Sequence, residues 1–560
     1  MSLGNKVGPV AMAVAAMLVS GLLNACSSAP QPQTTASAYF AAWTRQDWAA
    51  MQQLVWKPPA DFTAVNKAAF TSLGVHQATF APGTTVTSGS KATEPFTQRL
   101  ALTGVGTITI KSTLNLVLSQ GHWLVTWSPA TIAPQLRAGD HLALNVTWPA
   151  RAPILGSGGT PLTSQGDVVT IGVEGSRIKD AKAVQAALVA AGATATQASD
   201  AIAAAKLHPT FFEPVFTVSQ DRYNQLEPTI YPIPGTVFQS GNARSALTPG
   251  LAAGVVGTVG PITAQELGQL GAPYDATSTV GQTGLEQADE RQLAGQAGAT
   301  VTVANPSGTK VATVATLAPH PGTPVTTTID STVQHAAEAA LAGEKKSAAL
   351  VAVNATSGDV LASVSVNSGG FDQAIDGGFP PGSTFKVITS TALITRGLTP
   401  RSAASCPGTA TVDGEVFHNA EGEAPVSNLM QAFTESCNTA FIKLATGHLS
   451  PPDFPTAAAM FGLGKSLHIG LTAFGGSVPQ PTDRADLAAT SIGQGRVLVS
   501  PLGLAIVAAA ADTGTVRAPR LVTVGASTPG GGATGQLPAS VVRDLHEMMA
   551  SVVARGTAAS

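Results

Sequence analysis

The chain has 560 residues, which predicts three or four domains, because a domain contains roughly 150 residues on average. Hydrophobic residues make up 44% of the chain and charged residues 11%, against about 25% charged residues in an average soluble protein. This composition argues against intrinsic disorder. The 30 Lys and Arg residues nearly balance the 33 Asp and Glu residues, and a net charge of −3 argues against nucleic acid as a partner.

The N-terminal segment has the pattern of a secretory signal. Lys6 precedes an uncharged apolar stretch at residues 10–25, which is shorter than the roughly 20 residues of a membrane-spanning helix. The tetrapeptide LNAC that ends at Cys26 resembles a bacterial lipobox, in which cleavage before the cysteine frees it for lipid attachment. We therefore predict a lipoprotein signal peptide at residues 1–25, a lipid anchor on Cys26 at the outer face of the membrane and a solvated tether at 26–33. An ordinary signal peptide with an incidental cysteine is the alternative.

The region after the tether predicts a compact α+β domain at residues 34–147. Apolar residues recur near helical spacing over residues 36–55, which predicts an amphipathic helix. Apolar and polar residues then alternate over 114–118 and again over 123–127, with a Gln-Gly turn at residues 120–121. This pattern predicts a β-hairpin with one buried face.

The middle of the chain is less informative. Residues 148–318 mix strand-like runs such as 168–173 with an Ala-rich helical stretch at 181–205, and their composition alone identifies no function. Residues 319–324 read PHPGTP, and these three prolines hold the chain extended and prevent either neighbouring helix from continuing. We predict a linker there.

A further domain is predicted from residue 325 onward. It begins with a strand-like run at 325–329, followed by a helix at 330–341 for which Asp330 is a plausible N-cap. Two further apolar runs, 348–353 and 360–366, flank turn residues and predict a second hairpin.

The strongest chemical signal is the heptapeptide PPGSTFK at residues 380–386. Pro and Gly suit the start of a helix, and residues three apart, such as Ser383 and Lys386, then share one helical face. A serine hydroxyl is a weak nucleophile unless a neighbouring base takes its proton, and a lysine that is partly withdrawn from water can be neutral enough to do so. The helix N-terminus and the backbone N–H of Ser383 would stabilise the negative charge that develops on an attacked carbonyl.

The chain resembles the class B penicillin-binding proteins. The segments that carry the resemblance are PPGSTFKVI at 380–388, TESCNTAF at 434–441, GQG at 493–495, GPIT at 260–263, GQTGLE at 281–286 and residues 127–140. The resemblance implies a multidomain α+β protein with an NTF2-like α+β domain at 34–147 and a penicillin-binding-protein dimerisation domain at 148–318. After the linker at 319–324, it implies a transpeptidase domain at 325–560, a serine β-lactamase/transpeptidase-like α/β sandwich.

The resemblance also implies a reaction. Ser383 would attack the penultimate D-Ala of a peptidoglycan stem peptide ending in D-Ala-D-Ala, with Lys386 as general base. The terminal D-Ala would leave, and an amine of a neighbouring stem would take over the acyl group. Ser436 would relay a proton to the leaving amine, and Asn438 would hydrogen-bond the substrate. β-Lactams would acylate the same serine, no cofactor is implied, and the missing glycosyltransferase domain implies a separate glycan polymerase as partner.

The sequence departs from the family at one point. The family's third motif, Lys-Thr-Gly or Lys-Ser-Gly, occurs nowhere in these 560 residues. We therefore expect a transpeptidase domain that is truncated before this motif and, in this form, little acylation by penicillin. Two alternatives stay open, namely a D,D-carboxypeptidase or β-lactamase of the same fold, and a catalytically incompetent homologue that acts as a binding or scaffold protein.

Cys406 and Cys437 are the remaining cysteines, and both would lie outside the cytoplasm, where oxidation is permitted. Their spacing leaves open whether they form a disulfide or remain two buried thiols, because separation in sequence says nothing about distance in space. The chain contains neither a CxxC pair nor an HExxH motif, so a metal site is not indicated.

Overall fold

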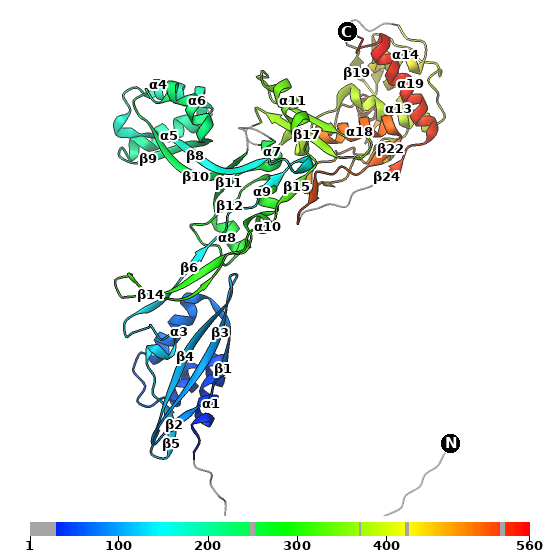
Figure 1. Cartoon of the computed structure of the whole chain (residues 1–560). Coiled ribbons are helices and arrows are strands. Elements are labelled where there is room, and N and C mark those ends of the chain that lie inside the picture. The colour runs from blue at the N-terminus through cyan, green and yellow to red at the C-terminus, as the bar shows by residue number, and fades with distance from the viewer. Residues whose placement is uncertain are drawn as a thin grey trace, which may run out of the picture. The chain divides into compact units, whose positions relative to one another are not determined.

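The computed structural model of the chain describes residues 30–193, 195–246, 252–368, 371–420, 425–526 and 533–559 (Figure 1). They form two compact units, one built from the chain up to Asn145 together with Thr300–Leu317, the other from Val146–Ala299 and the chain from Ala318 onward. The predicted signal peptide and Cys26 lie outside the described residues. Within the described part of the chain, no helix combines the length and the apolar character needed to cross a bilayer.

The first unit packs three helices against an antiparallel sheet with the strand order β1-β3-β4-β5, in which β2 extends the edge of β3. A second sheet has the order β14-β13-β6. The elements are α1 (Pro32–Thr44), α2 (Trp48–Gln53), α3 (Phe62–Leu73), β1 (Val75–Pro82), β2 (Val86–Ser88), β3 (Lys91–Leu102), β4 (Gly106–Ser119), β5 (His122–Val125), η1 (Pro129–Thr131), β6 (His141–Thr147), β13 (Gly298–Ala304) and β14 (Lys310–Leu317).

Aromatic stacking between the helices and the sheet forms the core of this unit. Every second residue of β3 is buried, as a strand with one covered face requires, and the Trp43 ring stacks on Phe80 with a centroid distance of 4.4 Å. The predicted hairpin is confirmed, because β4 and β5 pair with Ser119 opposite His122. The single helix predicted at 36–55 is wrong, since Gln46 has a φ of 55° and separates α1 from α2.

The second unit begins with a lobe in which helices α4, α5 and α6 cover a three-stranded sheet with the order β10-β8-β9. The helix predicted at 181–205 is in fact two helices, because α4 ends at Gly192. The elements up to residue 299 are β7 (Ile154–Leu155), η2 (Ser157–Gly159), β8 (Thr163–Glu174), η3 (Gly175–Arg177), α4 (Ala181–Ala191), α5 (Ala195–Leu207), β9 (Phe212–Ser219), α6 (Gln220–Ile230), β10 (Thr236–Ala246), α7 (Ala253–Val256), β11 (Val259–Pro261), α8 (Ala264–Leu270), β12 (Thr279–Gly281), α9 (Gly284–Ala288) and α10 (Glu290–Ala294).

In the remainder of the second unit, helices contain more residues than strands do. Its predicted opening is confirmed, because the Asp330 carboxylate accepts hydrogen bonds from the first turn of α11 and β16 pairs with β17 as a hairpin. The elements are β15 (Val325–Thr327), α11 (Ser331–Leu341), β16 (Ala348–Val353), β17 (Val360–Val366), α12 (Gln373–Asp376), η4 (Gly382–Phe385), α13 (Lys386–Thr395), β18 (Thr409–Val412), β19 (Glu415–His418), α14 (Leu429–Thr434), α15 (Asn438–His448), α16 (Asp453–Met460), β20 (Leu467–His468), β21 (Thr472–Ala473), α17 (Arg484–Ser491), α18 (Pro501–Thr513), β22 (Thr515–Arg517), β23 (Val522–Val524), β24 (Ala533–Gln536) and α19 (Ala539–Arg555).

The two regions of the second unit share a sheet and a core. Strand β7 pairs in parallel with β15, which in turn pairs with β23, and one buried cluster contains Ile154 and Leu285 as well as Val325 and Leu521. The Pro-rich segment at 319–324 is extended and packed in place, since His320 and Gln296 exchange two backbone hydrogen bonds of 2.9 Å. The two regions are therefore packed together through a common core.

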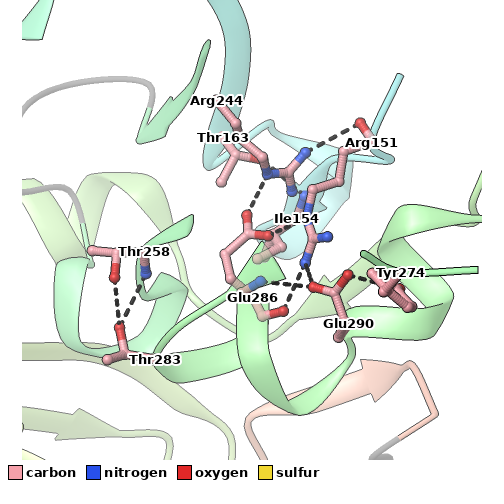
Figure 2. Close-up of polar contacts among 10 residues, drawn as sticks. Arg151, Ile154, Thr163, Arg244, Thr258, Tyr274, Thr283, Glu286 and Glu290 are labelled. Carbon is pink, nitrogen blue, oxygen red and sulfur yellow. Dashed lines mark hydrogen bonds and ion pairs between the residues drawn. The ribbon is translucent and has the colours of Figure 1, made fainter. Parts of the chain in front are cut away.

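A buried network of ion pairs joins the segments of this unit (Figure 2). The Arg151 guanidinium binds Glu286 at 2.6 Å and Glu290 at 2.8 Å, while Arg244 on β10 binds the other oxygen of Glu286. The Tyr274 hydroxyl donates to Glu290 at 2.9 Å. Two cations and two anions balance, which is the condition under which buried charges are tolerated.

Burial and pairing act on these groups in opposite directions. Burial disfavours the charged form of Arg151, but its contacts with Glu290 and Glu286 raise its pKa above the ordinary value. For Arg244, burial outweighs the attraction of Glu286 and lowers the pKa. Burial, reinforced by the Glu290 carboxylate, raises the pKa of Tyr274 and keeps its hydroxyl a donor. The network thus depends on both carboxyl side chains, because each of them contacts Arg151.

Replacing Glu286→Gln removes one negative charge without changing the shape of the side chain. Arg151 and Arg244 would then share a single buried carboxylate, so we expect the free energy of unfolding to fall by about 3 to 5 kcal/mol, the usual cost of breaking a buried pair on one side. Thermal and denaturant unfolding of the variant measure this loss.

The matched control is Asp413→Asn, which breaks the exposed pair with Arg484 at 3.8 Å. Asp413 has a φ of 50°, a conformation that Asn also adopts, so the exchange introduces no backbone strain. An exposed pair contributes at most about 1 kcal/mol, and equal effects of the two exchanges would contradict the role assigned to the network.

Candidate active site

Ser383 and Lys386 lie on consecutive helical elements and point toward each other. Gly382–Phe385 forms a 3-10 turn (η4) that continues directly into α13, and residues three apart eclipse each other in such a turn. Ser383 is exposed, whereas Lys386 is only 2% exposed, and its Nζ lies 3.0 Å from Ser383 Oγ. The predicted contact is therefore present, and the nucleophile candidate is the member of the pair that a substrate can reach.

Ser436 and Asn438 reach the same amine from another segment. Lys386 Nζ lies 2.9 Å from Ser436 Oγ and 2.7 Å from Asn438 Oδ1, and it also donates to the backbone carbonyl of Ser436. Asn438 is the first residue of α15. Ser436 has a φ of 55°, a left-handed conformation that is strained for a residue other than glycine and that turns its carbonyl toward the lysine. The structure thus brings all four predicted site residues together.

The oxygens around Lys386 Nζ determine which groups can exchange a proton with it. The Ser436 carbonyl and Asn438 Oδ1 only accept hydrogen bonds, so they occupy two N–H groups of the amine. A neutral amine has two N–H groups and one lone pair, and the hydroxyls of Ser383 and Ser436 lie close enough to donate to that lone pair. The arrangement suits a base that takes a proton from a serine.

Two contacts at this site were not predicted from the sequence motifs. The Phe441 ring lies under Lys386 Nζ with a centroid distance of 5.5 Å and is fully buried. Asn438 Nδ2 donates to the His418 carbonyl at 3.2 Å, so the end of β19 orients the Asn438 amide. The i+3 spacing of Asn438 and Phe441 on a helix could have indicated that they share a face.

Cys406 and Cys437 form a disulfide, with Cα atoms 6.1 Å apart. The sequence leaves open whether these cysteines form a disulfide or remain two thiols, and the structure contains the disulfide. Cys437 is fully buried between Ser436 and Asn438, and it caps α15 through a hydrogen bond from Ala440 N. The bond ties this turn to the loop ahead of β18.

The Gly-Gln-Gly turn at residues 493–495 supports the backbone ahead of Ser383. Gly382 N donates to the Gly493 carbonyl at 2.9 Å. A Cβ atom at Gly493 would lie 2.1 Å from the Gly382 carbonyl oxygen and 2.7 Å from Phe385 Cβ, so a side chain cannot be placed there without moving the backbone next to Ser383.

A cavity of about 310 Å³ opens beside the serine. Ser383, Lys386 and Ser436 contribute its polar wall, and Phe433 and Met549 contribute apolar side chains. Within the described ranges, no three His, Cys, Asp or Glu side chains come together as a metal site would need. The chemistry that the arrangement offers is nucleophilic attack by Ser383 on a group held in the cavity, with Lys386 as its base.

Three family models match consecutive parts of the chain. The NTF2-like N-terminal transpeptidase domain matches residues 31–140, the penicillin-binding protein dimerisation domain matches 146–327, and the penicillin binding protein transpeptidase domain matches 348–560. Fold and site thus define a penicillin-binding protein with a serine transpeptidase domain. These three domains in this order are the architecture of the class B penicillin-binding proteins, and the chain belongs to that family.

Two curated relatives are both named peptidoglycan D,D-transpeptidase PbpA. The protein from Mycolicibacterium smegmatis is 35% identical over 175 residues, which are 28% of this chain and 35% of the relative. The protein from Mycobacterium tuberculosis (strain H37Rv) is 36% identical over 163 residues, which are 27% of this chain and 32% of the relative. The alignments thus span about a third of the length of these curated relatives.

Two solved structures share the fold. One, described as "Structural coordination of polymerization and crosslinking by a peptidoglycan synthase complex", has a TM-score of 0.54 and 23% identity, and covers 76% of this chain and 80% of its own. The other is a complex between the penicillin-binding protein PBP2 and MreC from Helicobacter pylori, with a TM-score of 0.52 and 18% identity over 73% of this chain and 84% of its own.

Gly493→Ala tests the close contact behind Ser383. The added Cβ must displace the Gly382 carbonyl or Phe385, so we expect the reaction of Ser383 with a fluorescent penicillin to slow at least about tenfold, because small displacements of reacting groups have large effects on rate. The labelling rate is measured by stopped flow, on the protein as its gene encodes it.

Gly495→Ala is the matched control in the same turn. Its φ of 74° nearly equals the 70° of Gly493. Both exchanges therefore introduce the same backbone strain, about 1 to 2 kcal/mol for an alanine in the left-handed conformation. The Cβ at Gly495 meets only ordinary contacts of 3.4 and 3.5 Å. Similar labelling rates for the two variants would show that left-handed strain, and not the contact with Gly382, is responsible.

Proposed function

We propose that the protein is a D,D-transpeptidase that cross-links peptidoglycan stem peptides through an acyl-enzyme on Ser383, and that β-lactams acylate the same serine. The observation that supports this most directly is the convergence of Ser383, Ser436 and Asn438 on Lys386 Nζ, with distances of 3.0, 2.9 and 2.7 Å. The names of the curated relatives agree with it.

Each proposed step moves a proton between groups that lie in contact. Ser383 Oγ bonds to the carbonyl carbon of the penultimate D-Ala while Lys386 Nζ takes its proton. The peptide bond breaks, and the terminal D-Ala leaves as an amine that receives a proton through Ser436 Oγ. An amine of a second stem then attacks the ester, a new peptide bond forms, and Ser383 regains its proton. Asn438 would bind both the substrate amide and Lys386 Nζ, and so keep the substrate close to the base.

We also propose the setting in which this enzyme works. The lipobox-like segment supports a lipoprotein that is anchored through Cys26 at the outer face of the cell membrane. A separate glycan polymerase would supply the strands to be cross-linked, and one structural relative is described as a complex that coordinates polymerisation with cross-linking. For the domains we propose 34–147, 148–318 and 325–560, with a tether at 26–33 ahead of the first domain and a linker at 319–324 between the second and the third.

Fluorescent penicillin tests the nucleophile. We expect one label per protein molecule on Ser383, located by peptide mass spectrometry, no label on Ser383→Ala, and a rate at least about a hundredfold lower for Lys386→Ala, because a general base contributes about 10² to 10⁴ in rate. Lys443→Ala removes an exposed lysine of α15 and should label like the wild type. The experiment uses the protein as its gene encodes it.

Product analysis separates the alternatives. With a stem peptide that ends in D-Ala-D-Ala and an amine acceptor, a transpeptidase forms the cross-linked peptide, which mass spectrometry detects. Release of D-Ala with hydrolysis alone would identify a carboxypeptidase, and hydrolysis of the penicillin a β-lactamase. A protein that carries no label on Ser383 would act as a binding or scaffold protein, and the proposal would be withdrawn.

The anchor is tested at Cys26. Mature wild-type protein is expected to carry the added mass of a diacylglycerol on its N-terminal cysteine and to partition into Triton X-114, since the acyl chains add apolar surface to the tether. Cys26→Ser should lose both properties. Cys406→Ser is the matched control, because it removes a cysteine from the catalytic domain and should leave partitioning unchanged. An unlipidated wild type would indicate an ordinary signal peptide.

A further inference from the structure

The side chain of Asn419, directly after β19, joins three segments beside the site. Its Oδ1 accepts a hydrogen bond from Thr439 N at 2.9 Å, and its Nδ2 donates to the Pro407 carbonyl at 2.8 Å and to Thr439 Oγ1 at 3.1 Å. The Thr439 hydroxyl in turn donates a hydrogen bond to Pro407 O at 2.6 Å. These bonds link the loop ahead of β18, the end of β19 and the first turn of α15, and Asn419 Nδ2 also lies 3.3 Å from Cys406 Sγ of the disulfide.

The chemistry of the partners fixes how this amide is oriented. Thr439 N can only donate and Pro407 O can only accept, so Oδ1 must face the former and Nδ2 the latter. The amide therefore uses its oxygen and both N–H groups. A side chain that lacks either its acceptor or its donors cannot keep all three segments together, and the buried groups left unpaired would cost stability.

The bonds of Asn419 bracket Asn438. Asn419 binds the backbone N–H of Thr439, the residue directly after Asn438. His418, the residue directly before Asn419, accepts a hydrogen bond from Asn438 Nδ2 through its carbonyl at 3.2 Å. With its Nδ2 held in this way, Asn438 presents Oδ1 to Lys386 Nζ at 2.7 Å. The first turn of α15 and the Asn438 amide are thus positioned from one short segment of chain.

We propose that Asn419 is a positioning residue for the acylation of Ser383, acting through Asn438 on Lys386. This inference rests on the proposed function, because it concerns the rate of that reaction. Asn419 touches none of the reacting atoms. Its part is to keep the Asn438 oxygen aimed at Lys386 Nζ, so that the two N–H groups of the amine stay occupied and its lone pair stays directed at the serine.

The contribution of Asn419 differs from that of the neighbouring disulfide. The Cys406–Cys437 bond holds the backbone just ahead of α15, whereas Asn419 holds the amide and hydroxyl of Thr439 inside its first turn. The effect of Asn419 is therefore expected in protein whose disulfide is intact. Mass spectrometry under non-reducing conditions shows whether it is intact in each variant.

The test separates binding from chemistry in the reaction with a fluorescent penicillin. For Asn419→Ala and Asn419→Asp we expect the first-order acylation rate at saturating penicillin to fall about tenfold to a hundredfold, while the concentration for half-saturation changes less than about threefold. Asn419→Asp keeps the acceptor for Thr439 N but sets an oxygen against Pro407 O. Asn354→Ala is the matched control, since it removes hydrogen bonds of 2.9 and 3.0 Å in the β16–β17 turn and should leave the rate unchanged.

A double-mutant cycle tests the route through Asn438. If Asn419 acts through that side chain, adding Asn419→Ala to Asn438→Ala should slow acylation by less than about twofold beyond Asn438→Ala alone. Should Asn419→Ala prove unstable, Thr439→Val removes only the hydroxyl that Asn419 and Pro407 share, and the same cycle is run with it.

The outcomes are distinguishable. No label on Ser383 of the wild type would overturn the proposed function, and this inference with it. A wild type that labels, together with Asn419 variants that label at the same saturating rate, would overturn the positioning role alone. Full additivity with Asn438→Ala would overturn the route through Asn438 and point to a purely structural contribution.

Discussion

A buried amine constrains the catalytic region more than any other group. Lys386 is almost entirely withdrawn from water, and a lysine in that position must find oxygen partners nearby. Those partners come from the 3-10 turn η4 directly ahead of its helix and from the segment that begins α15, some fifty residues further along the chain. The fold must therefore hold α13 and α15 together closely enough for Ser436 and Asn438 to reach one nitrogen atom, and the left-handed conformation of Ser436 is tolerated because it turns a carbonyl toward that nitrogen.

Three structural features support this contact. The turn at Gly493 supports the backbone ahead of Ser383, with no room for a side chain between them. The disulfide at Cys437 fixes the backbone between Ser436 and Asn438. The amide of Asn419 holds the first turn of α15. One support is close-packed backbone, one is a covalent bond and one is a hydrogen-bonded side chain, so the exposed serine sits on a frame that has little freedom to adjust.

Local patterns made part of this structure predictable. Alternation located the β4–β5 hairpin, a capping carboxylate located the start of α11, and the spacing of Ser383 and Lys386 located the candidate nucleophile and its base. The ion-pair network was not predictable, because Arg151, Arg244 and Glu286 are far apart in sequence and isolated charges are usually solvated. The break between α1 and α2 was also not predictable, because a glutamine such as Gln46 rarely adopts a positive φ and its side chain gives no indication of one.

The second unit buries charge in two different ways, and the difference bears on function. In the network, carboxylates face guanidinium groups that do not lose their protons, so the pairs are permanent and serve stability. Around Lys386, the oxygens of Ser383, Ser436 and Asn438 carry no formal charge. An uncharged oxygen favours the ammonium form less strongly than a carboxylate does, so these contacts orient the amine without binding its proton permanently. Orientation without a fixed charge is what a residue needs if it is to take a proton from a serine and later return it.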